Sequence, residues 1–583
     1  MRRWLSLLLG LVLLLATAPG RAGAVAARGG AGVPASPAPG ADGLTARSGA
    51  REKPAPPRRL QVGGSGAGST AGAAGTIWVG ATPPGWDPAT DPVVVFVQGL
   101  NGRAENWWTE SVYYGRNDMY DLAYWSGYQT AFVDLYDSDG NPGSMWANGA
   151  LLASQIRTIA DYFGVDTVSI VAHSKGGIDA NAAIVHYGAA PRVDRVVTLG
   201  SPHWGSPLAD LAYSSWAGWL AELLGARNDG VYVLQTGYME YFRSLTDHRA
   251  EDRNVQYLTG AGTRWGPFPS ALWLGGLALS AWGQNDGLVP LWSARKPGAA
   301  EIFVRDLDHD QIRVGRYTWH LFEPYLRAAG PSSQPETGAR AAPPGSLPEG
   351  PGAVSPASMA PGAESEQMIL RGGYGTAIIE TIPIEGGVGE VHFQLLASHA
   401  SLTAWVVSPT GQRHDLVHRG TSSHLEVLPG ARAYSARVTG PAAGTWTLHI
   451  QAGAPVAYLA ETLLKGVGAT ATLAADRLYT PGQAGDLRLD LSPTARKGKL
   501  QVRATLRPVL PRGTPGAVPL SFEVEGEGLR ARPSLPAPGI YLVEVTVTGT
   551  LADGSPFERS LVRTVAAAHP GDRSPEHLQR LGP

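Results

Sequence analysis

The chain has 583 residues, a formal net charge of −2, 16% charged residues and no cysteine. Its length exceeds the roughly 100 to 200 residues of a single domain, which predicts about two to four domains. The lack of cysteine excludes a disulfide framework and a thiolate nucleophile, and the near-neutral charge excludes a basic surface for nucleic acid.

The N-terminus has the layout of a secretory signal peptide. Arg2 and Arg3 precede an apolar run over residues 5–18, and a small-x-small sequence follows at residues 22–24. Because the run is too short for a membrane span, we expect residues 1–24 to be removed and the protein to be secreted; a retained N-terminal anchor is the alternative. Residues 25–75 are rich in Gly, Ala and Pro without a hydrophobic period, which predicts a flexible leader.

Residues 76–327 alternate between two hydrophobic patterns. Continuous β-rich runs occur at residues 93–97, 130–135, 167–172, 195–200 and 255–260, and helical stretches separate them. Residues 147–164 repeat apolar side chains at helical spacing, for example Leu152, Ile156 and Ile159. Strands that are apolar on both faces and alternate with helices predict an α/β domain with a parallel sheet covered by helices.

The remainder of the chain has a different pattern. Residues 328–366 are rich in proline and predict a linker. Short alternating strands separated by Gly and Pro turns then predict all-β sandwich modules, Ig-like in character, over residues 367–465 and 466–568, with a tail at 569–583. A single large sandwich is the alternative.

The sequence VAHSKGG at residues 171–177 places Ser174 between a predicted strand and a predicted helix. A serine at such a sharp turn projects its hydroxyl from the top of the sheet, and the turn requires small residues two positions before and after it. Ala172 and Gly176 meet this requirement. We therefore predict that Ser174 is a nucleophile.

A nucleophilic serine needs a base and an acid, in the order Ser, Asp, His for this kind of turn. Asp286 in QNDGLVP and His309 in RDLDHDQIR follow Ser174 in that order, each just after a strand-like run. The backbone N–H groups of Leu100, in the glycine-rich turn QGLNG, and of Lys175 are the predicted oxyanion-hole donors.

These motifs resemble the secreted bacterial lipases of the α/β-hydrolase fold. The resemblance covers about residues 85–327 and rests on QGLNG, AHSKGG, LGSPHWGSPLADL, NDGLVP and DHDQ in this order. It implies Ser174, Asp286 and His309 as the catalytic residues. Gln98 and Lys175 depart from the family pattern, and we expect both to alter what the substrate touches. Two residues are predicted to bind substrate: Gln98 in the QGLNG turn, and Trp204 in the PHWGS segment.

Residues 207–225 carry a broad apolar stripe at helical spacing that includes Trp216 and Trp219. We predict a cap over the acyl site in which these two tryptophans bind substrate. A helix this apolar also fits the buried core of a domain.

The sequence thus predicts a secreted serine ester hydrolase acting on lipid, without a cofactor. Many of the lipases it resembles hold a structural calcium, for which Asp308 and Asp310 offer carboxylates. The alternatives are an extracellular polyester depolymerase and a non-catalytic surface protein with a relic hydrolase domain. In each case the β-modules are candidates for attachment to a surface or an insoluble substrate.

Overall fold

The structure is a computed structural model that describes residues 52–61, 73–267, 270–327, 366–399, 401–422, 428–476, 478–510 and 516–569. The predicted signal peptide at 1–24 lies outside the described residues, as do most of the predicted leader, linker and tail. Within the described ranges, no helix has both the length and the apolar character needed to cross a membrane.

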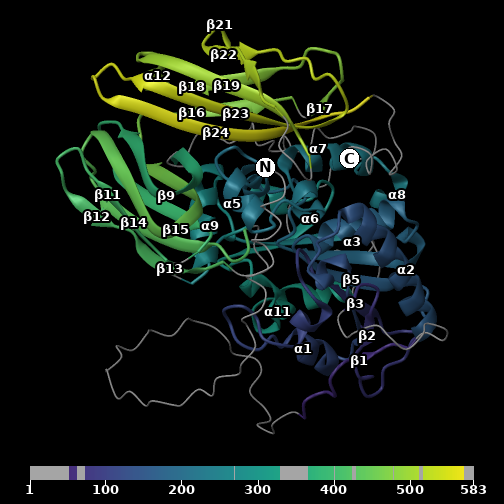
Figure 1. Ribbon diagram of the computed structural model, residues 1–583. Helices are drawn as coiled ribbons and strands as arrows, with labels where there is room; N and C mark the ends of the chain where they lie inside the picture. Colours follow the sequence, from purple (N-terminus) through teal and green to yellow (C-terminus); the bar gives the residue numbers. More distant parts are fainter. Residues whose placement is uncertain are drawn as a thin grey trace, which may run out of the picture. The chain divides into compact units, whose positions relative to one another are not determined.

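An eight-stranded sheet forms the centre of the N-terminal half, with strand order β1-β2-β4-β3-β5-β6-β7-β8 (Figure 1). Strands β3 to β8 run parallel, while β2 is antiparallel to β4 and β1 is antiparallel to β2. The strands are β1 (Arg58–Arg59), β2 (Ile77–Val79), β3 (Val93–Val97), β4 (Gln129–Val133), β5 (Val168–His173), β6 (Val193–Leu199), β7 (Gln256–Gly262) and β8 (Ala300–Arg305). The predicted α/β fold is confirmed. Strand β1, however, lies within the segment predicted as a flexible leader.

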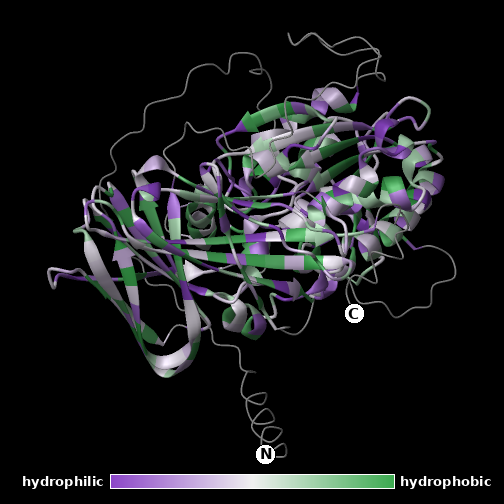
Figure 2. Cartoon of the chain, turned by 90° about the horizontal axis from the view of Figure 1, so that it is seen from above, coloured by the Kyte–Doolittle hydropathy of each residue, from purple (hydrophilic) through white to green (hydrophobic). Residues whose placement is uncertain are grey.

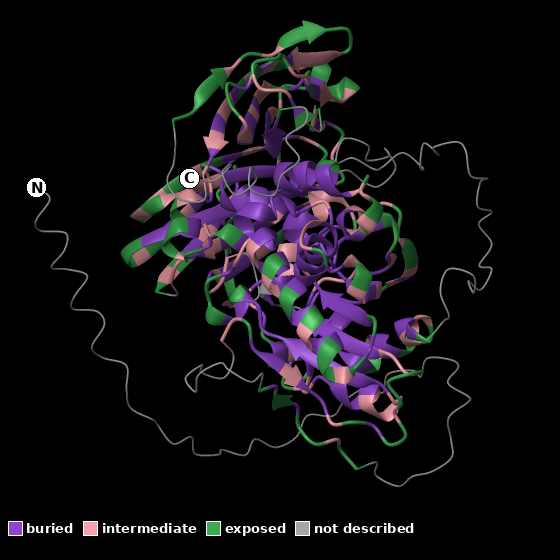
Figure 3. Ribbon diagram, turned by 90° about the vertical axis from the view of Figure 1, so that its right-hand side faces the viewer, coloured by how far each residue is buried: buried purple, intermediate pink, exposed green. Residues whose placement is uncertain are grey.

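Helices cover both faces of this sheet because the strands bury alternate residues on opposite sides. In β3, Val93, Val95 and Val97 join the core beneath α2 and α3, whereas Val94 and Phe96 join the core beneath α1 and α11. The central strands are buried throughout, as Figure 3 shows, and hydrophobic in character (Figure 2). The helices are α1 (Met119–Trp125), α2 (Met145–Phe163), α3 (Gly176–His186), α4 (Pro207–Ala212), α5 (Gly218–Leu223), α6 (Asp229–Val233), α7 (Thr236–Thr246), α8 (Ala250–Arg253), α9 (Ala271–Leu279), α10 (Leu291–Ala294) and α11 (Gly315–Leu326).

The first C-terminal module is one continuous seven-stranded antiparallel sheet rather than two separate sheets. Its two longest strands, β9 and β15, pair along most of their length; β11 pairs with the first part of β15 and β10 with the last part. Both parts contribute to one hydrophobic core. The strands are β9 (Gln367–Ile384), β10 (Glu390–Ala397), β11 (Leu402–Val407), β12 (Arg413–Asp415), β13 (Val417–Thr421), β14 (Arg432–Thr439) and β15 (Gly444–Lys465).

The second module is a sandwich of a four-stranded and a five-stranded sheet around a shared core. Its pairs are antiparallel except for the short parallel pair between β17 and β24. The elements are β16 (Ala471–Ala475), β17 (Leu478–Tyr479), β18 (Leu487–Leu491), α12 (Pro493–Arg496), β19 (Lys499–Val509), β20 (Val518–Leu520), β21 (Glu523–Glu525), β22 (Gly528–Ala531), β23 (Gly539–Thr550) and β24 (Pro556–Ala567). All-β modules after the hydrolase-like domain are therefore confirmed.

The two modules, together called the β-region (described residues 366–569), pack against helices α4 to α7. One hydrophobic core contains residues of both parts, among them Leu211, Leu220 and Met239 from the helices and Leu370, Leu459 and Leu542 from the strands. Buried polar contacts join the same surfaces: Arg563 pairs with Glu240 at 3.0 Å, and the Gly237 N–H donates to Thr564 at 2.8 Å. The β-region is thus packed onto the α/β domain with the character of a domain interior.

This packing corrects the prediction for residues 207–225. The segment forms two short helices, α4 and α5, instead of one. Most of their apolar residues, such as Leu211, Ala212 and Leu220, are buried in the core shared with the β-region, which agrees with the buried alternative, whereas Trp219 and Leu223 are exposed. At Gly372 of β9 an added Cβ would lie 1.7 Å from the carbonyl oxygen of Trp216, so only glycine fits where the strand crosses this segment.

Candidate active site

Ser174 lies in the turn between β5 and α3 with a φ of +55°, in the left-handed region that non-glycine residues rarely adopt. The turn is tight because the neighbouring backbone comes close to it. A Cβ at Gly176 would lie 2.6 Å from the Gln98 carbonyl oxygen, and one at Gly177 would lie 2.3 Å from the Ser201 hydroxyl oxygen. This explains the small residues after Ser174 and gives the geometry of a nucleophile elbow.

The predicted oxyanion loop lies directly against this elbow. A Cβ at Gly99 would be 2.6 Å from the Lys175 backbone nitrogen and 2.7 Å from the Ser174 Cβ. The glycine therefore lets the backbone before Leu100 approach the start of α3. This places the two predicted donors, the N–H groups of Leu100 and Lys175, on neighbouring segments beside Ser174.

His309 lies in the loop between β8 and α11, and its ring is hydrogen-bonded to Asp286. The distance from Nδ1 to Asp286 Oδ2 is 2.8 Å, and the His309 backbone N–H also donates to the Asp286 carbonyl at 2.9 Å. The Asp286 side chain accepts further hydrogen bonds from the backbone N–H groups of Leu288 and Val289. The carboxylate is thus fixed on the Nδ1 side, which leaves Nε2 of His309 to act as a base.

A second histidine of the same pocket, His173, is hydrogen-bonded to the backbone of His309. Burial lowers the pKa of His173 well below its usual value, with the charges of His309 and Arg313 acting in the same direction, so its ring is neutral. Its Nε2 lies 2.8 Å from the His309 carbonyl oxygen and must carry the hydrogen. Nδ1 must therefore accept a hydrogen bond. The Gln98 amide oxygen, 3.2 Å from Nδ1, cannot donate one, whereas the Gln98 NH2 group is a buried donor without a partner, so we assign the amide with its NH2 group turned toward Nδ1.

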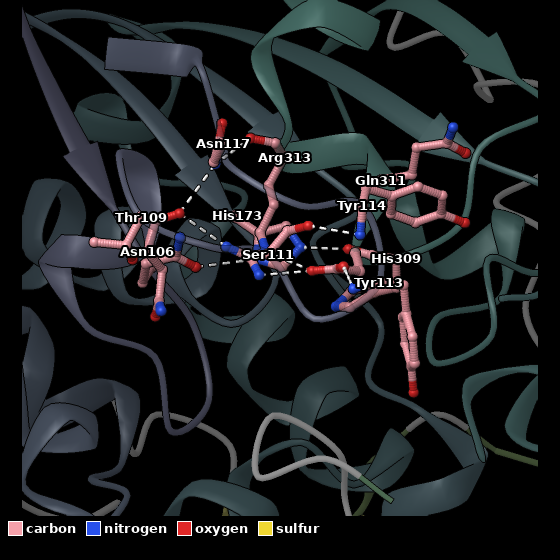
Figure 4. A network of polar contacts seen from close by, with 12 residues as sticks. Asn106, Thr109, Ser111, Tyr113, Tyr114, Asn117, His173, His309, Gln311 and Arg313 are labelled. Atoms are coloured by element: carbon pink, nitrogen blue, oxygen red, sulfur yellow. Dashed lines mark hydrogen bonds and ion pairs between the residues drawn. The ribbon is translucent and has the colours of Figure 1, made fainter. Parts of the chain in front are cut away.

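The loop that carries His309 is held by its flanking carboxylates. Asp308 Oδ1 accepts from the backbone N–H groups of Asp310 and Gln311, and its other oxygen accepts from the Tyr114 hydroxyl. Asp310 pairs with Arg313 at 2.6 Å, and Arg313 donates in turn to the Asn106 carbonyl at 2.9 Å. Figure 4 shows Arg313 between the Asn106 side of this network and the His309 side.

These contacts bear on the predicted calcium. The oxygens of Asp308 and Asp310 already accept hydrogen bonds from protein donors or pair with an arginine. Across the described residues, no group of three or more His, Cys, Asp or Glu side chains is arranged to hold a metal ion. The carboxylates beside His309 therefore do not fit a calcium site.

Ser174 and His309 line the same pocket. Its lining includes the polar residues Gln98, His173, Asp310 and Arg313. The lining also includes Gly99, Tyr113 and four apolar residues, Leu100, Val112, Leu272 and Leu288. The pocket thus combines reactive polar groups with an apolar lining.

Of the predicted substrate-binding residues, Gln98 lines this pocket and the three tryptophans do not. Trp204 donates its ring N–H to the Arg295 carbonyl at 3.1 Å and packs elsewhere. Trp216 packs into the core shared with the β-region, and Trp219 stacks on Tyr374 of β9. The tryptophans thus contact other parts of the protein and not the pocket wall.

The Lys175 side chain also points away from the substrate. It is fully buried, and its Nζ pairs with Asp137 and Asp179. The expectation that this side chain alters what the substrate touches is therefore wrong, although its backbone N–H remains beside Ser174.

Sequence reasoning missed several residues that shape the site. A Cβ at Gly200, which has a φ of +60°, would lie 2.9 Å from Asp286 Oδ2 and 3.3 Å from His309 Nδ1. The position of Gly200 directly after strand β6 was a usable signal. Leu272 of α9 gave no such signal, because its segment carries no polar motif.

Comparisons with known proteins agree with this site. The sequence pattern of a family described as "PGAP1-like alpha/beta domain" matches residues 89–215. The Bacillus licheniformis lipase BlEst2 in propeptide form is 31% identical and superimposes with a TM-score of 0.68, covering 85% of this chain and 98% of that chain. The chain belongs to the family of this lipase. The predicted resemblance to bacterial lipases of the α/β-hydrolase fold is thereby confirmed.

Two further structures are more distant in overall superposition. The mature form of the same Bacillus lipase is 45% identical, with a TM-score of 0.40, and covers 44% of this chain and 99% of that chain. Lipase B of Aspergillus fumigatus is 15% identical, with a TM-score of 0.22, and covers 30% of this chain and 40% of that chain. No curated protein sequence gives a significant match.

Proposed function

We propose that the chain is a secreted serine carboxylic-ester hydrolase of the lipase or esterase kind, acting through an acyl-enzyme intermediate. One observation carries the proposal: Ser174 stands on a strained elbow in the same pocket as His309, and His309 is hydrogen-bonded to Asp286. A strained nucleophile turn beside an oriented imidazole is the arrangement that acyl transfer requires.

In this mechanism Asp286 holds the Nδ1–H of His309 and stabilises the imidazolium when it forms. Nε2 of His309 takes the proton of the Ser174 hydroxyl while Oγ attacks the ester carbonyl carbon. The N–H groups of Leu100 and Lys175 donate to the oxyanion. The tetrahedral intermediate collapses, the alcohol leaves with the proton from His309, and a water molecule activated by His309 releases the acid.

The apolar lining of the pocket favours an acyl chain as the group next to the ester. The side chains of Leu100, Val112, Leu272 and Leu288 offer no hydrogen-bond partner to a polar substituent. We therefore place lipid esters first among the substrates, with a polyester as the alternative.

The test compares the full chain with Ser174→Ala. The parent is expected to hydrolyse p-nitrophenyl esters and to be labelled by a fluorophosphonate probe, and the variant is expected to do neither while keeping the parent's melting temperature. A parent that is folded but neither labelled nor active on short esters, emulsified triglyceride or solid polyester would refute the proposal and favour a relic hydrolase domain.

We also propose that the β-region is a removable pro-region. The chain matches 98% of the Bacillus lipase in its propeptide form, and the β-region covers apolar helices next to the site. Leu288, which lines the Ser174 pocket, also lines a second apolar pocket whose other wall includes Leu396 and Leu459 of the β-region.

A specific protease site introduced within residues 331–365 tests this second proposal in the full chain. Cutting and releasing the β-region should raise hydrolysis of an emulsified long-chain ester more than hydrolysis of a short soluble ester, since it uncovers the apolar surface. The parent without the site, treated with the same protease, is the control. Equal change for both esters, or loss of both, would contradict a pro-region.

A further inference from the structure

A buried ion cluster lies directly behind the elbow. Lys175, the residue after Ser174, has a fully buried side chain whose Nζ is 3.0 Å from both carboxylate oxygens of Asp179 and 3.1 Å from Asp137 Oδ2. Asp137 and Asp179 are almost completely buried as well. Asp179 belongs to α3, and Asp137 belongs to a 3₁₀ turn, Tyr136–Asp139, that follows β4.

The cluster contacts both segments that carry the proposed oxyanion donors. Asp137 Oδ1 accepts from the backbone N–H of Asn101, which follows Leu100, at 3.3 Å. Asp137 Oδ2 accepts from Lys175 Nζ, on the residue whose backbone N–H is the second donor. The two oxygens of one carboxylate thus connect the two donor segments. Asn148 of α2 completes the network by donating to Asp179 at 3.0 Å and to Asp137.

The backbone at both segments is strained. Within the described ranges, Asn101 and Ser174 are the two non-glycine residues with a positive φ, +54° and +55°. Each is the immediate neighbour of a proposed donor, Leu100 or Lys175. Residues in this conformation persist only where the surroundings hold them, and they concentrate at functional sites.

The charges of the cluster are balanced only in part. Burial alone lowers the pKa of Lys175, but Asp137 and Asp179 outweigh this and raise it, so the lysine is charged. Burial raises the pKa of Asp179 to about 7, and the repulsion of Asp137 adds to this against the attraction of Lys175. Lys175 thus carries its charge between two buried carboxylates, and of these two Asp137 also contacts the backbone N–H of Asn101.

We propose that Asp137 and Lys175 are positioning residues that hold the two oxyanion donors at a fixed separation, with Asp179 as a secondary partner. The inference rests on the proposed ester hydrolase function. The Lys175 side chain is fully buried, so a substrate cannot reach it. We therefore assign it the role of fixing the backbone around Ser174 and Leu100 through Asp137. Loss of the link should therefore reduce kcat more than it changes KM, because oxyanion donors act mainly in the transition state.

The test compares Asp137→Asn with Asp179→Asn in the full chain, using a short soluble ester. Both substitutions remove one carboxylate from the same lysine. An asparagine at 137 presents its NH2 group to Lys175 or to the Asn101 N–H, so kcat should fall about 10- to 100-fold with KM within about threefold. Asp179→Asn should stay within about threefold of the parent, because Asp179 contacts Lys175 and Asn148 while the Asn101 N–H bonds to Asp137.

Equal losses in the two variants, or a loss at Asp137 that appears in KM alone, would overturn the positioning role. If Asp137→Asn does not fold, Asp137→Glu keeps the charge and displaces it by one methylene, and the same comparison applies. A parent without activity would instead refute the proposed function, which keeps the two failures distinct.

Lys175→Met gives a readout that a merely structural role would not produce. Without the cation, Asp137 and Asp179 repel each other once both ionise, whereas one proton shared between them at acid pH keeps them together. The ratio of kcat in Lys175→Met to kcat in the parent should therefore fall as pH rises from 5 to 8. Groups that titrate alike in both proteins cancel from this ratio. A ratio that is independent of pH would contradict the proposal.

Discussion

The Ser174 pocket and the surface of α4 to α7 lie in the same domain but are held by different forces. The pocket is built by short polar contacts between turns at the ends of strands, such as the 2.8 Å bond between His309 and Asp286, 23 positions apart. The helical surface is built by apolar burial against strands far along the chain: Gly237 contacts Thr564, 327 positions away.

This difference separates the effects expected from substitutions. A polar group in the pocket contributes to the rate and little to stability, since its neighbours remain hydrogen-bonded when it is replaced. A residue on the helical surface contributes to docking of the β-region and leaves the chemistry unchanged. Substitutions in the pocket should therefore change the rate, and substitutions on the helical surface should change stability.

The largest effect is expected at Asp286. Asp286→Asn replaces an acceptor with an amide that cannot stabilise the imidazolium, so kcat should fall about 10³- to 10⁴-fold with little change in melting temperature. Asp308→Asn is the comparison, because Asp308 organises the same loop without touching the His309 ring. It should lower stability more than rate. If Asp308→Asn proves the more damaging to kcat, Asp286 is not the acid.

A large effect on docking is expected at Gly237. An added Cβ would lie 2.7 Å from the Thr564 carbonyl carbon and from the Val565 nitrogen, so β24 must shift. Gly237→Ala should destabilise the docked β-region by about 1–3 kcal/mol, measured as a lower unfolding midpoint in urea. Hydrolysis of a soluble ester should stay within about twofold.

Gly453→Ala is the matched control. Gly453 is exposed on β15, and a Cβ there would meet nothing within 4 Å. It should leave both midpoint and rate near those of the parent. Equal destabilisation by the two alanines would show that Gly237 matters for its backbone flexibility and not for close packing.

The contrast between local contacts at the pocket and distant contacts at the helical surface also explains which parts of the structure were predictable from sequence. The strand runs at 93–97 and 167–172, the elbow at Ser174 and the order of Asp286 and His309 are local signals, and the sheet topology brings them together without further information. The role of residues 207–225 was not predictable, because the surface that buries them lies more than a hundred residues later. The partners of Lys175 were equally hidden, since Asp137 carries no motif.

A smaller, pH-dependent effect is expected from Glu461 on β15. Its carboxyl is buried in the apolar pocket between α9 and the β-region, where it accepts from Gln394 at 3.0 Å. Burial raises the pKa of Glu461 to about 8 from its ordinary value of 4.5. The docked state therefore binds the extra proton, so its contribution is fully present below about pH 4.5 and is lost as pH rises through 8.

Glu461→Gln should remove this dependence. The melting temperature of the parent, relative to that of the glutamine variant, should fall by several degrees between pH 5 and pH 8.5, at roughly 2–4 °C per kcal/mol. Taking the difference between the two proteins cancels other groups that titrate in both, including Asp210, whose pKa burial raises to about 6. If the melting temperatures of the two proteins change in parallel between pH 5 and pH 8.5, Glu461 is not buried by docking.

The smallest effect is expected at Trp219. Its side chain is 60% exposed and its main aromatic contact is the stacked ring of Tyr374, 5.7 Å away. Trp219→Ser in the uncut chain should therefore change the melting temperature by about 1–2 °C at most and leave soluble-ester hydrolysis unchanged, since an exposed stacked pair contributes about 0.5–1.5 kcal/mol. After release of the β-region the ring loses Tyr374 and lies on an apolar surface. If that surface binds lipid, the cut variant should adsorb less to an emulsified ester than the cut parent. A loss of soluble-ester activity in the uncut chain would instead mean that this tryptophan, despite its place beside β9, is coupled to the Ser174 pocket.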